Sequence, residues 1–441
     1  NRSTTDAAAA LQGKAAGVQV LATSGAPGAG SEIRVRGVSS NSGNLGPLLI
    51  VDGLKVDNIQ YLDPDMIESM EILKDAASAA IYGARAANGV VLVTTRQGKK
   101  DTHANVSFDA YAGIQTPNTN GVKALSGQEY IDIMDKTFVL AGTLQPGQHY
   151  TQVDMQAYAP VQYEWMKSGK WNGTNWFEEK INKNAPTNNY VVAVNGGSDM
   201  SRYSMSYSKS YSEGTLGYPK PSYYDRTTIR LNSDYSLYRR GNRDIVKLGE
   251  NVTLSITDSR SVATGGQYSN DITSALNKTP LLPAYDLDGS FYTYEKQLRD
   301  GWNLKDETNS IESASYGDRE GKGYRVQGNV YLEISPIKEL KIRTQYGMNY
   351  NLSFSRSYTP AYQLSGTDTS HQDDQVSQSA SIGTNWTWET TVNYKKEISD
   401  HSIEGLIGAS IEGTGWGMSV NGSRKQTKFG TWEAASISQC Q

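Results

Sequence analysis

The sequence predicts a small α+β domain followed by the strands of an antiparallel β-barrel that spans a membrane. Three observations lead to this fold class. The first hundred residues mix short apolar segments with glycine-rich loops, and the rest of the chain alternates polar and apolar side chains over segments of about ten residues. Short and long connections also follow one another between these segments. We therefore expect a first domain at residues 1–100 and barrel strands within residues 101–441.

The composition limits the class of protein. The chain has 441 residues, with 28 Tyr, 6 Phe and 43 Gly, and its mean hydropathy is -0.56. No segment approaches the ~20 consecutive apolar residues of a membrane-spanning helix, whereas barrel strands need be apolar on one face only. The net charge of -4 and the scattered Lys and Arg predict no nucleic-acid partner. The single cysteine, Cys440, rules out an internal disulfide framework.

The first domain contains short helices and strands in alternation. The expected elements are a helix at 7–12, strands at 18–21, 33–35 and 48–51, a helix at 65–73 and a strand at 90–95. The pair Asp52-Gly53 directly follows an apolar run and is typical of a tight turn. The last strand is apolar on both faces, which predicts a central, buried position in a sheet.

Long segments with a period of two residues follow the first domain. At 202–211 one face carries Tyr203, Met205 and Tyr207, while serines occupy the other face. The same alternation predicts about nine strands, at 106–114, 190–194, 202–211, 229–235, 246–256, 324–334, 340–350, 380–394 and 403–411. Glu250 falls on an apolar face, so either it lies near a membrane interface or the register slips at Gly249.

The connections favour a membrane barrel over a soluble sheet. Long connections are expected at 117–186, 214–222, 258–323 and 354–375, short turns at 196–201, 335–338 and 398–401, and a somewhat longer turn at 236–244. Outer-membrane barrels have short periplasmic turns and long extracellular loops, and they close because lipid offers the backbone no hydrogen-bond partner. A soluble antiparallel β protein is the alternative, since its strands alternate in the same way.

Four motifs of the first domain resemble the plug of SusC/RagA-type TonB-dependent transporters. They are ALQGKAAGVQV at 10–20, IRVRG at 33–37, PLLIVDG at 47–53 and EILKDAASAAIYGARAANGVVLVTT at 71–95. The similarity continues at APTNNY (185–190), at GGS (196–198) and at Asp286, Asp288 and Gly289 of a long loop. The resemblance implies an α+β plug domain inside a transmembrane antiparallel β-barrel of 22 strands, of which the chain supplies about nine. We therefore expect a partial barrel and a chain truncated at both ends.

The resemblance also implies a function. It implies TonB-dependent active import of oligosaccharides, or of oligopeptides, across the outer membrane of a Gram-negative bacterium. The implied partners are a SusD-like surface lipoprotein, TonB-ExbB-ExbD, outer-membrane lipid and a glycan or peptide ligand. No cofactor and no enzymatic activity are expected. Two alternatives stay open, a plugged-barrel surface receptor or adhesin that binds ligand without transport, and a soluble β-rich enzyme.

The plug motifs supply the candidate functional residues. They are Arg34, Arg36, Gly37, Asp52, Gly53, Lys74, Asp75, Tyr82, Gly83, Arg85, Asn88 and Gly89. Arg34 and Arg36 share one face of a strand, where they either pair with carboxylates of the barrel wall or cover the plug's own surface. Gly83 and Gly89 bracket the link to the last plug strand, and we expect them to allow close approach of the backbone.

The connection at 117–186 contains a predicted helix at 126–139 followed by several aromatic residues. Trp165, Trp171 and Trp176 are candidates for ligand or partner contacts in this extracellular loop, and the alternative is that they pack a core of the loop itself. The four histidines lie far apart in the sequence, and no nucleophile or metal-ligand motif occurs. We expect no catalytic residue and no metal site.

Overall fold

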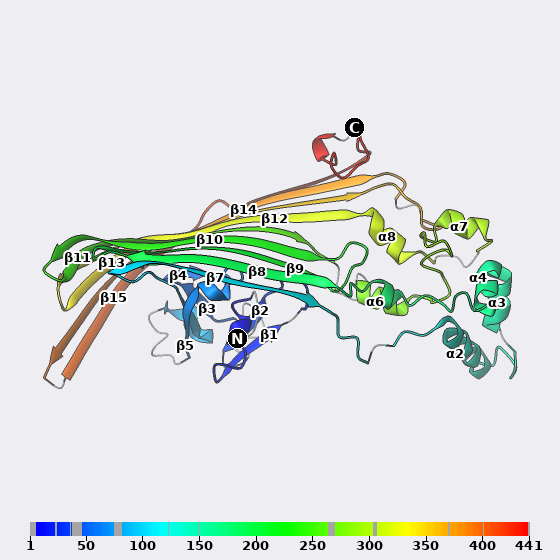
Figure 1. The fold of residues 1–441 in the computed structure, drawn as a ribbon, viewed down its shortest axis with the longest axis horizontal. Coiled ribbons are helices and arrows are strands. Elements are labelled where there is room, and N and C mark those ends of the chain that lie inside the picture. Colours follow the sequence, from blue (N-terminus) through cyan, green and yellow to red (C-terminus); the bar gives the residue numbers. More distant parts are fainter. Residues whose placement is uncertain are drawn as a thin grey trace.

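The computed structural model shows a long antiparallel sheet with a small domain against one face and a group of helices at one end (Figure 1). It describes the chain except for residues 1–5, 23, 36, 38–45, 75–81, 122, 149, 263–269, 303–306, 369–370, 400 and 440–441. None of the helices in the described part of the chain is both long enough and apolar enough to cross a membrane.

The long sheet forms a wall whose strands follow one another in sequence order. They are β7 (Thr102–Gln115), β8 (Ala185–Gly197), β9 (Ser201–Glu213), β10 (Tyr223–Arg240), β11 (Arg243–Arg260), β12 (Asp318–Ile337), β13 (Leu340–Thr359), β14 (Gln375–Ile398), β15 (His401–Thr414) and β16 (Met418–Lys425). Each strand from β7 to β15 is antiparallel to the next, so all nine predicted strands are confirmed.

The strand β16 was not predicted, because Met418 and Val420 are its only apolar residues. β15 pairs with residues 385–398 of β14, and β16 pairs with residues 375–382 of the same strand. Both pairings are antiparallel, and residues 415–417 separate them. β15 and β16 therefore lie end to end along the same edge of β14, with a break between them.

The two faces of the wall differ in polarity. On β10 Arg226 and Arg230 are buried on the face that meets the small domain, whereas Ile229 is exposed on the other face. On β11 the apolar face runs from Val246 to Ile256, which is about 33 Å along a strand at ~3.3 Å per residue. A strand tilt of about 40° reduces this length to a height of ~25 Å, the thickness of the apolar band of an outer-membrane barrel.

Glu250 lies on this outer, apolar face, as its sequence position predicted. The pairing of β11 with β12 is continuous from Val246 to Ser259, so the register does not slip at Gly249. The Glu250 carboxylate accepts a hydrogen bond from Ser233 Oγ on β10. The serine hydroxyl therefore satisfies part of the hydrogen-bonding capacity of a carboxylate among apolar neighbours.

Short and long connections alternate along the wall, as predicted. The short turns are residues 198–200, 241–242, 338–339 and 399–400, and the long connections are residues 116–184, 214–222, 261–317 and 360–374. The turn expected at 236–244 is shorter than predicted, because β10 and β11 continue to a two-residue turn. Since consecutive strands are antiparallel, the long connections leave the wall at one end and the short turns at the other.

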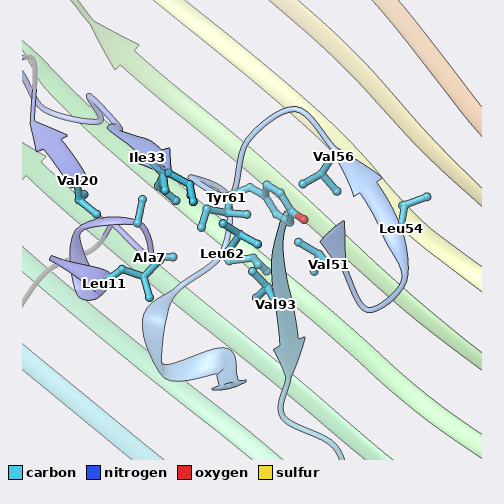
Figure 2. Close-up of a cluster of buried hydrophobic side chains, with 14 residues drawn as sticks. Ala7, Leu11, Val20, Ile33, Val51, Leu54, Val56, Tyr61, Leu62 and Val93 are labelled. Atoms are coloured by element: carbon cyan, nitrogen blue, oxygen red, sulfur yellow. The ribbon is translucent and has the colours of Figure 1, made fainter. Parts of the chain in front are cut away.

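The N-terminal domain combines a two-stranded hairpin with a four-stranded sheet. The hairpin joins β1 (Val18–Ala22) and β2 (Ser31–Val35), and the sheet has the order β4-β3-β6-β5. The strands of this sheet are β3 (Leu48–Val51), β4 (Leu54–Val56), β5 (Ile67–Leu73) and β6 (Val90–Thr95). Figure 2 shows the apolar core of the domain, in which Leu62 and Val93 are almost inaccessible to water.

The helix predicted at 65–73 is wrong. Pro64–Met66 form one 3-10 turn, η2, capped by the Asp63 carboxylate, and the following residues form β5. β5 pairs with β6, and the hydrogen bonds of this ladder override the helical spacing of the apolar residues. The helix predicted at 7–12 is likewise reduced to a 3-10 turn, η1 (Ala9–Leu11).

Two long connections fold together into one unit, which we call the helical cap. Its helices are α2 (Gly127–Leu140), α3 (Tyr150–Tyr158), α4 (Pro160–Lys167), α5 (Trp176–Glu179), α6 (Asp271–Asn277), α7 (Tyr294–Arg299) and α8 (Ser310–Tyr316). Trp176 of the first connection shares a core with Tyr292 and Ile311 of the second. The helix predicted at 126–139 is confirmed as α2, which begins with a capping box between Ser126 and Glu129.

Candidate functional site between the N-terminal domain and the wall

The N-terminal domain lies against the polar face of the wall (Figure 1). This face is polar because alternate residues of the strands carry hydroxyl, amide and guanidinium groups. The domain meets these groups with the turn between β3 and β4 and with the loop before η2. The polar groups of the wall and those of the domain therefore satisfy one another by hydrogen bonds across the contact.

Asp52 is the centre of this contact. It occupies the turn between β3 and β4 with φ 46°, next to Gly53 with φ 85°, a geometry that Asp and Gly tolerate in turns. The Asp52 carboxylate accepts hydrogen bonds from the Thr95 amide at 2.9 Å and from Thr95 Oγ1 at 2.8 Å. Arg230 Nη2 of β10 forms an ion pair with Asp52 Oδ2, and both side chains are 5% exposed.

Arg230 uses its whole guanidinium group at this site. Its Nε donates to Thr95 Oγ1 at 3.0 Å, and its Nη1 donates to Thr253 Oγ1 of β11 at 2.5 Å. Asn329 Nδ2 of β12 donates to the Asp52 carbonyl oxygen at 2.9 Å. Because buried charges are tolerated only when they are paired and hydrogen-bonded, this network determines where the turn lies on the wall.

A second group of contacts holds the loop at residues 58–61. Thr228 Oγ1 of β10 donates to the Tyr61 carbonyl oxygen at 3.1 Å, and Arg325 Nη1 of β12 donates to Asn58 Oδ1 at 2.9 Å. Burial raises the pKa of the Tyr61 hydroxyl above its ordinary value, so the hydroxyl stays protonated. The wall thus supplies hydrogen bonds to a loop that has no ladder of its own.

A third group of contacts consists of partly exposed ion pairs between the N-terminal domain and the strands β14 and β15 at one edge of the wall. Lys55 Nζ of β4 pairs with Glu412 of β15 and lies 3.9 Å from Glu389 Oε1 of β14. Arg85 Nη1 lies 2.9 Å from Glu412 Oε2, and the Arg85 side chain is 71% exposed. Solvent screens such pairs, so they contribute less to docking than the buried Asp52 contact does.

The wall also accommodates the domain by shape. Gly347 of β13 faces Leu54 of β4, and a Cβ atom at Gly347 would overlap the Leu54 side chain. Two residues earlier on β13, Gln345 Nε2 donates to the Gly53 carbonyl oxygen at 2.9 Å. The absence of a side chain at Gly347 is therefore what lets the turn approach the strand closely.

The predicted arginine pair is only partly described. Arg34 Nη2 lies 2.9 Å from Glu32 Oε2 of its own strand, β2. Among the described residues, this ion pair supports the second possibility for Arg34, cover of the plug's own surface, because a carboxylate on the same face compensates its charge. Arg36 lies outside the described residues, and Gly37 has φ 86°.

Other predicted motif residues contribute to the N-terminal domain itself. Lys74 Nζ donates to the Ala16 carbonyl oxygen. Tyr82 packs against a small apolar cluster, and burial raises the pKa of its hydroxyl. Asn88 is half-buried, and Asp75 lies outside the described residues.

Gly83 and Gly89 flank the 3-10 turn η4 (Ala84–Asn88), with φ 69° and φ 87°. A Cβ atom at Gly89 would lie 3.0 Å from Val35 Cγ1 of β2. Around Gly83 no atom of the described residues lies within 4 Å of the place of a Cβ atom. The predicted close approach is therefore confirmed at Gly89, whereas at Gly83 the described residues show only a positive φ that favours glycine.

Two of the three tryptophans proposed as contact residues are buried. Trp165 is 8% exposed and Trp176 is 1% exposed, and both belong to the core of the helical cap. Ligand contact is therefore wrong for these two residues, because burial of their rings against the second connection removes apolar surface from water. Trp171 is half-buried, and its contact role stays a prediction.

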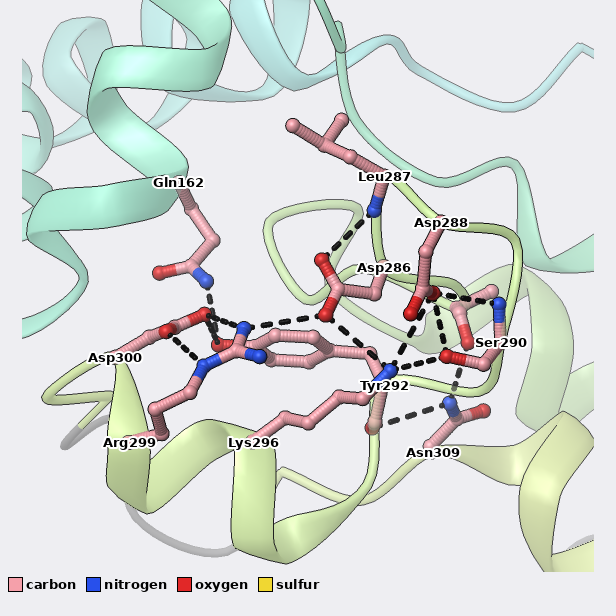
Figure 3. Close-up of polar contacts among 11 residues, drawn as sticks. Gln162, Asp286, Leu287, Asp288, Ser290, Tyr292, Lys296, Arg299, Asp300 and Asn309 are labelled. Atoms are coloured by element: carbon pink, nitrogen blue, oxygen red, sulfur yellow. Dashed lines mark hydrogen bonds and ion pairs between the residues drawn. The ribbon is translucent and has the colours of Figure 1, made fainter.

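A polar network holds one turn of the helical cap against α7 (Figure 3). Asp286 Oδ2 lies 3.2 Å from Lys296 Nζ and 3.1 Å from Arg299 Nη2. Burial acts to raise the pKa of Asp286, but hydrogen bonds from the Leu287 amide and from these two cations outweigh it and lower the pKa. Among the described residues, no group of three or more His, Cys, Asp or Glu is placed to hold a metal ion.

The wall residues that hold the N-terminal domain were not predicted. Arg226, Thr228, Arg230 and Asn232 occupy alternate positions of β10, and all are buried. The available signal was Arg230 in the strand predicted at 229–235, with Arg226 in phase with it just before that strand. Arginine is rarely buried without an anionic partner, so this face pointed to a carboxylate from another part of the chain.

Comparison with known proteins gives these features a family context. Residues 1–90 match the family model described as TonB-dependent Receptor Plug Domain. The chain is 32% identical over 418 residues to the TonB-dependent receptor P26 of Formosa agariphila, covering 91% of this chain and 37% of that protein. It is 30% identical over 291 residues to the TonB-dependent receptor SusC of Bacteroides thetaiotaomicron, covering 64% of this chain and 25% of that protein.

A solved structure has the same fold. The chain aligns with the structure of the RagAB peptide importer in the open-open state with a TM-score of 0.82 and 25% identity. The alignment covers 100% of this chain and 48% of that chain, and this chain spans 37% of the first curated relative. The N-terminal domain is thus a plug, and the strands that follow are part of a barrel wall. The chain therefore belongs to the SusC/RagA-type TonB-dependent transporters.

Proposed function

We propose that the chain supplies the plug, residues 1–100, and part of the wall, within residues 101–441, of an active importer in the outer membrane of a Gram-negative bacterium. The Asp52–Arg230 contact is the main support, because it holds the plug on the polar face that lines the barrel. A plug held in this way closes the route along the polar face, so a solute passes only after the plug moves. Movement requires energy because a buried ion pair and its hydrogen bonds must break.

The energy source in this proposal is the TonB-ExbB-ExbD complex, which acts on the plug from the periplasmic side. The short turns of the wall mark this side, and the helical cap at the other end faces outward. A SusD-like surface lipoprotein covers the outer end and delivers the ligand. The similarity to SusC and to the RagAB peptide importer supports this partner.

The ligands in this proposal are oligosaccharides, with oligopeptides as the second class. The similarity to SusC supports the first class, and the likeness to a structure named as a peptide importer supports the second. The chain carries out no bond chemistry in this scheme. Its work is a conformational change of the plug that ligand binding permits and TonB drives.

The test is uptake by cells that produce the full-length protein with its partner lipoprotein. Labelled oligosaccharides and oligopeptides are supplied to cells with and without TonB, and internal label is measured over time. We expect uptake that depends both on the protein and on TonB. Ligand that binds to the cell surface but never enters in either strain would refute import and favour a surface receptor. Equal entry with and without TonB would refute the role of the plug as an energised gate.

A further inference from the structure

A chamber lies between the plug and the half of the wall that carries the short turns. Its volume is about 920 Å³, and it is lined by the Asp52-Gly53 turn of the plug and by inward-facing residues of β9 to β15. Lys247, Glu333 and Lys341 line it close to the turns that join their strands. The chamber is therefore on the periplasmic side of the Asp52 contact in the proposed orientation.

Carboxylates on the plug side of the chamber all have cation partners. Asp52 is paired with Arg230, as described above, and Asp234 of β10 forms an ion pair with Arg202 of β9. The Asp234 side chain is 4% exposed, so its charge is largely withdrawn from water as well as paired. These two acids therefore give the chamber little free negative charge.

Carboxylates farther along the wall are paired in the same way. Glu333 Oε1 of β12 lies 3.5 Å from Lys341 Nζ of β13. Glu389 Oε1 of β14 lies 3.9 Å from Lys55 Nζ of the plug. Lys341 and Lys55, which line this part of the chamber, thus each compensate the negative charge of a glutamate.

Arg343 of β13 is different from these cations. Within the described residues, no carboxylate oxygen lies within 4.0 Å of its guanidinium nitrogens, although the residue lines the chamber. Its contact is with an aromatic ring, because the guanidinium carbon lies 3.8 Å from the centre of the Tyr331 ring on β12. A guanidinium stacked by its face on a ring keeps the N–H donors at its edge available.

The ring beneath Arg343 is held in place by the neighbouring strand. Gly249 of β11 is paired with Tyr331 in the sheet, and a Cβ atom at Gly249 would overlap the ring. The ring therefore packs over a bare stretch of backbone, and the guanidinium packs over the ring. This stack orders Arg343 before any ligand arrives, which lowers the entropy cost of binding.

We propose that Arg343, stacked on Tyr331, binds the carboxylate of a solute in this chamber after the plug has released it from the extracellular side. The inference rests on the proposed import function, and it adds a binding site on the exit route and a ligand class, a carboxylate-bearing oligomer. The planar fork of the guanidinium matches the two oxygens of a carboxylate. The carboxylate belongs either to an acidic sugar or to the C-terminus of a peptide, and both sources present the same group.

The experiment measures binding by calorimetry to the purified full-length protein in detergent, without TonB. The acidic probes are trigalacturonate and N-acetyl-trialanine, and the neutral probes are the full methyl ester of trigalacturonate and N-acetyl-trialaninamide. For at least one pair, we expect the acid to bind about 10- to 100-fold more tightly than its neutral counterpart, as expected for a charge-assisted hydrogen bond. The pair that shows the preference identifies the acidic glycan or the peptide as the source.

Variants of Arg343 and of a wall cation outside the chamber assign the effect to Arg343. Arg343→Gln is expected to abolish the preference for the acid, and Arg343→Lys is expected to retain part of it, because the charge remains without the fork. Lys322→Gln is the control, since Lys322 of β12 is also a wall cation paired with an acid, Glu320, but it does not line the chamber and is expected to leave the preference unchanged.

Two results overturn the proposal. One is equal binding of acid and neutral probe to the wild-type protein for both pairs, and the other is a preference that survives Arg343→Gln. Failure of the import function has a separate signature, because TonB-independent uptake together with an Arg343-dependent preference in detergent would refute the importer and leave the carboxylate site standing.

Discussion

Replacement of Arg230 by methionine removes the wall's half of the buried contact that holds the plug. Methionine fills a similar length of space but offers no hydrogen bond to Thr95, to Thr253 or to the Asp52 carboxylate. Asp52 keeps its two hydrogen bonds from Thr95 but loses its compensating charge. When the plug is docked, the turn between β3 and β4 then buries an acid without a charge partner. The cost of burying this charge weakens docking of the plug.

The magnitude follows from the burial of the pair. Loss of one partner from a buried, hydrogen-bonded ion pair costs about 3–5 kcal/mol. Because Thr95 still satisfies part of the Asp52 carboxylate, we expect the lower end of this range, about 3 kcal/mol. A free-energy change of ~3 kcal/mol corresponds to a roughly 100-fold increase in the population of the undocked plug.

Hydrogen–deuterium exchange of the full-length protein measures this population. Amides of the loop at residues 58–61 are expected to exchange about 100-fold faster in Arg230→Met, since this loop has no ladder of its own and becomes exposed when the plug leaves the wall. The double variant Asp52→Asn with Arg230→Met is expected to recover part of the protection, because no unpaired charge is buried. Arg299→Met in the helical cap is the control and should leave these amides unchanged. Exchange within threefold of wild type in Arg230→Met would refute the reasoning.

Three further predictions concern shape, core and charge. Gly347→Val is expected to displace Leu54 and loosen the plug, measured by the same exchange, whereas Gly383→Val, which faces open space, should have no effect. Trp176→Ala is expected to destabilise the helical cap by about 3–5 kcal/mol in chemical denaturation followed by fluorescence, with plug exchange unchanged. The lowered pKa of Asp286 means that its contribution to cap stability is present above the ordinary Asp pKa of about 4 and is lost as pH falls below it. In acid titration followed by cap fluorescence, the stability difference between wild type and Asp286→Asn should therefore be full above that pH and shrink as pH falls below it.

The sequence alone determined the strand pattern of the wall and the alternation of short and long connections. Both depend on local chemistry, because the side chains of a strand alternate between its faces and turn residues interrupt the run. The turn at Asp52-Gly53 and the strand at 90–95 were predictable for the same reason. The sequence also identified the plug motifs, although it did not show what each residue contacts.

Only the tertiary structure decided three features. Residues 67–73 become a strand because β6 supplies a ladder for them, and the helical spacing of their side chains does not reveal this. Trp176 is buried because a second connection, about a hundred residues later, covers it. Arg230 meets Asp52 across 178 positions of sequence, and the local pattern of either residue does not identify so distant a partner. Periodicity reports which face a residue occupies, but the partner on that face depends on how distant segments fold together.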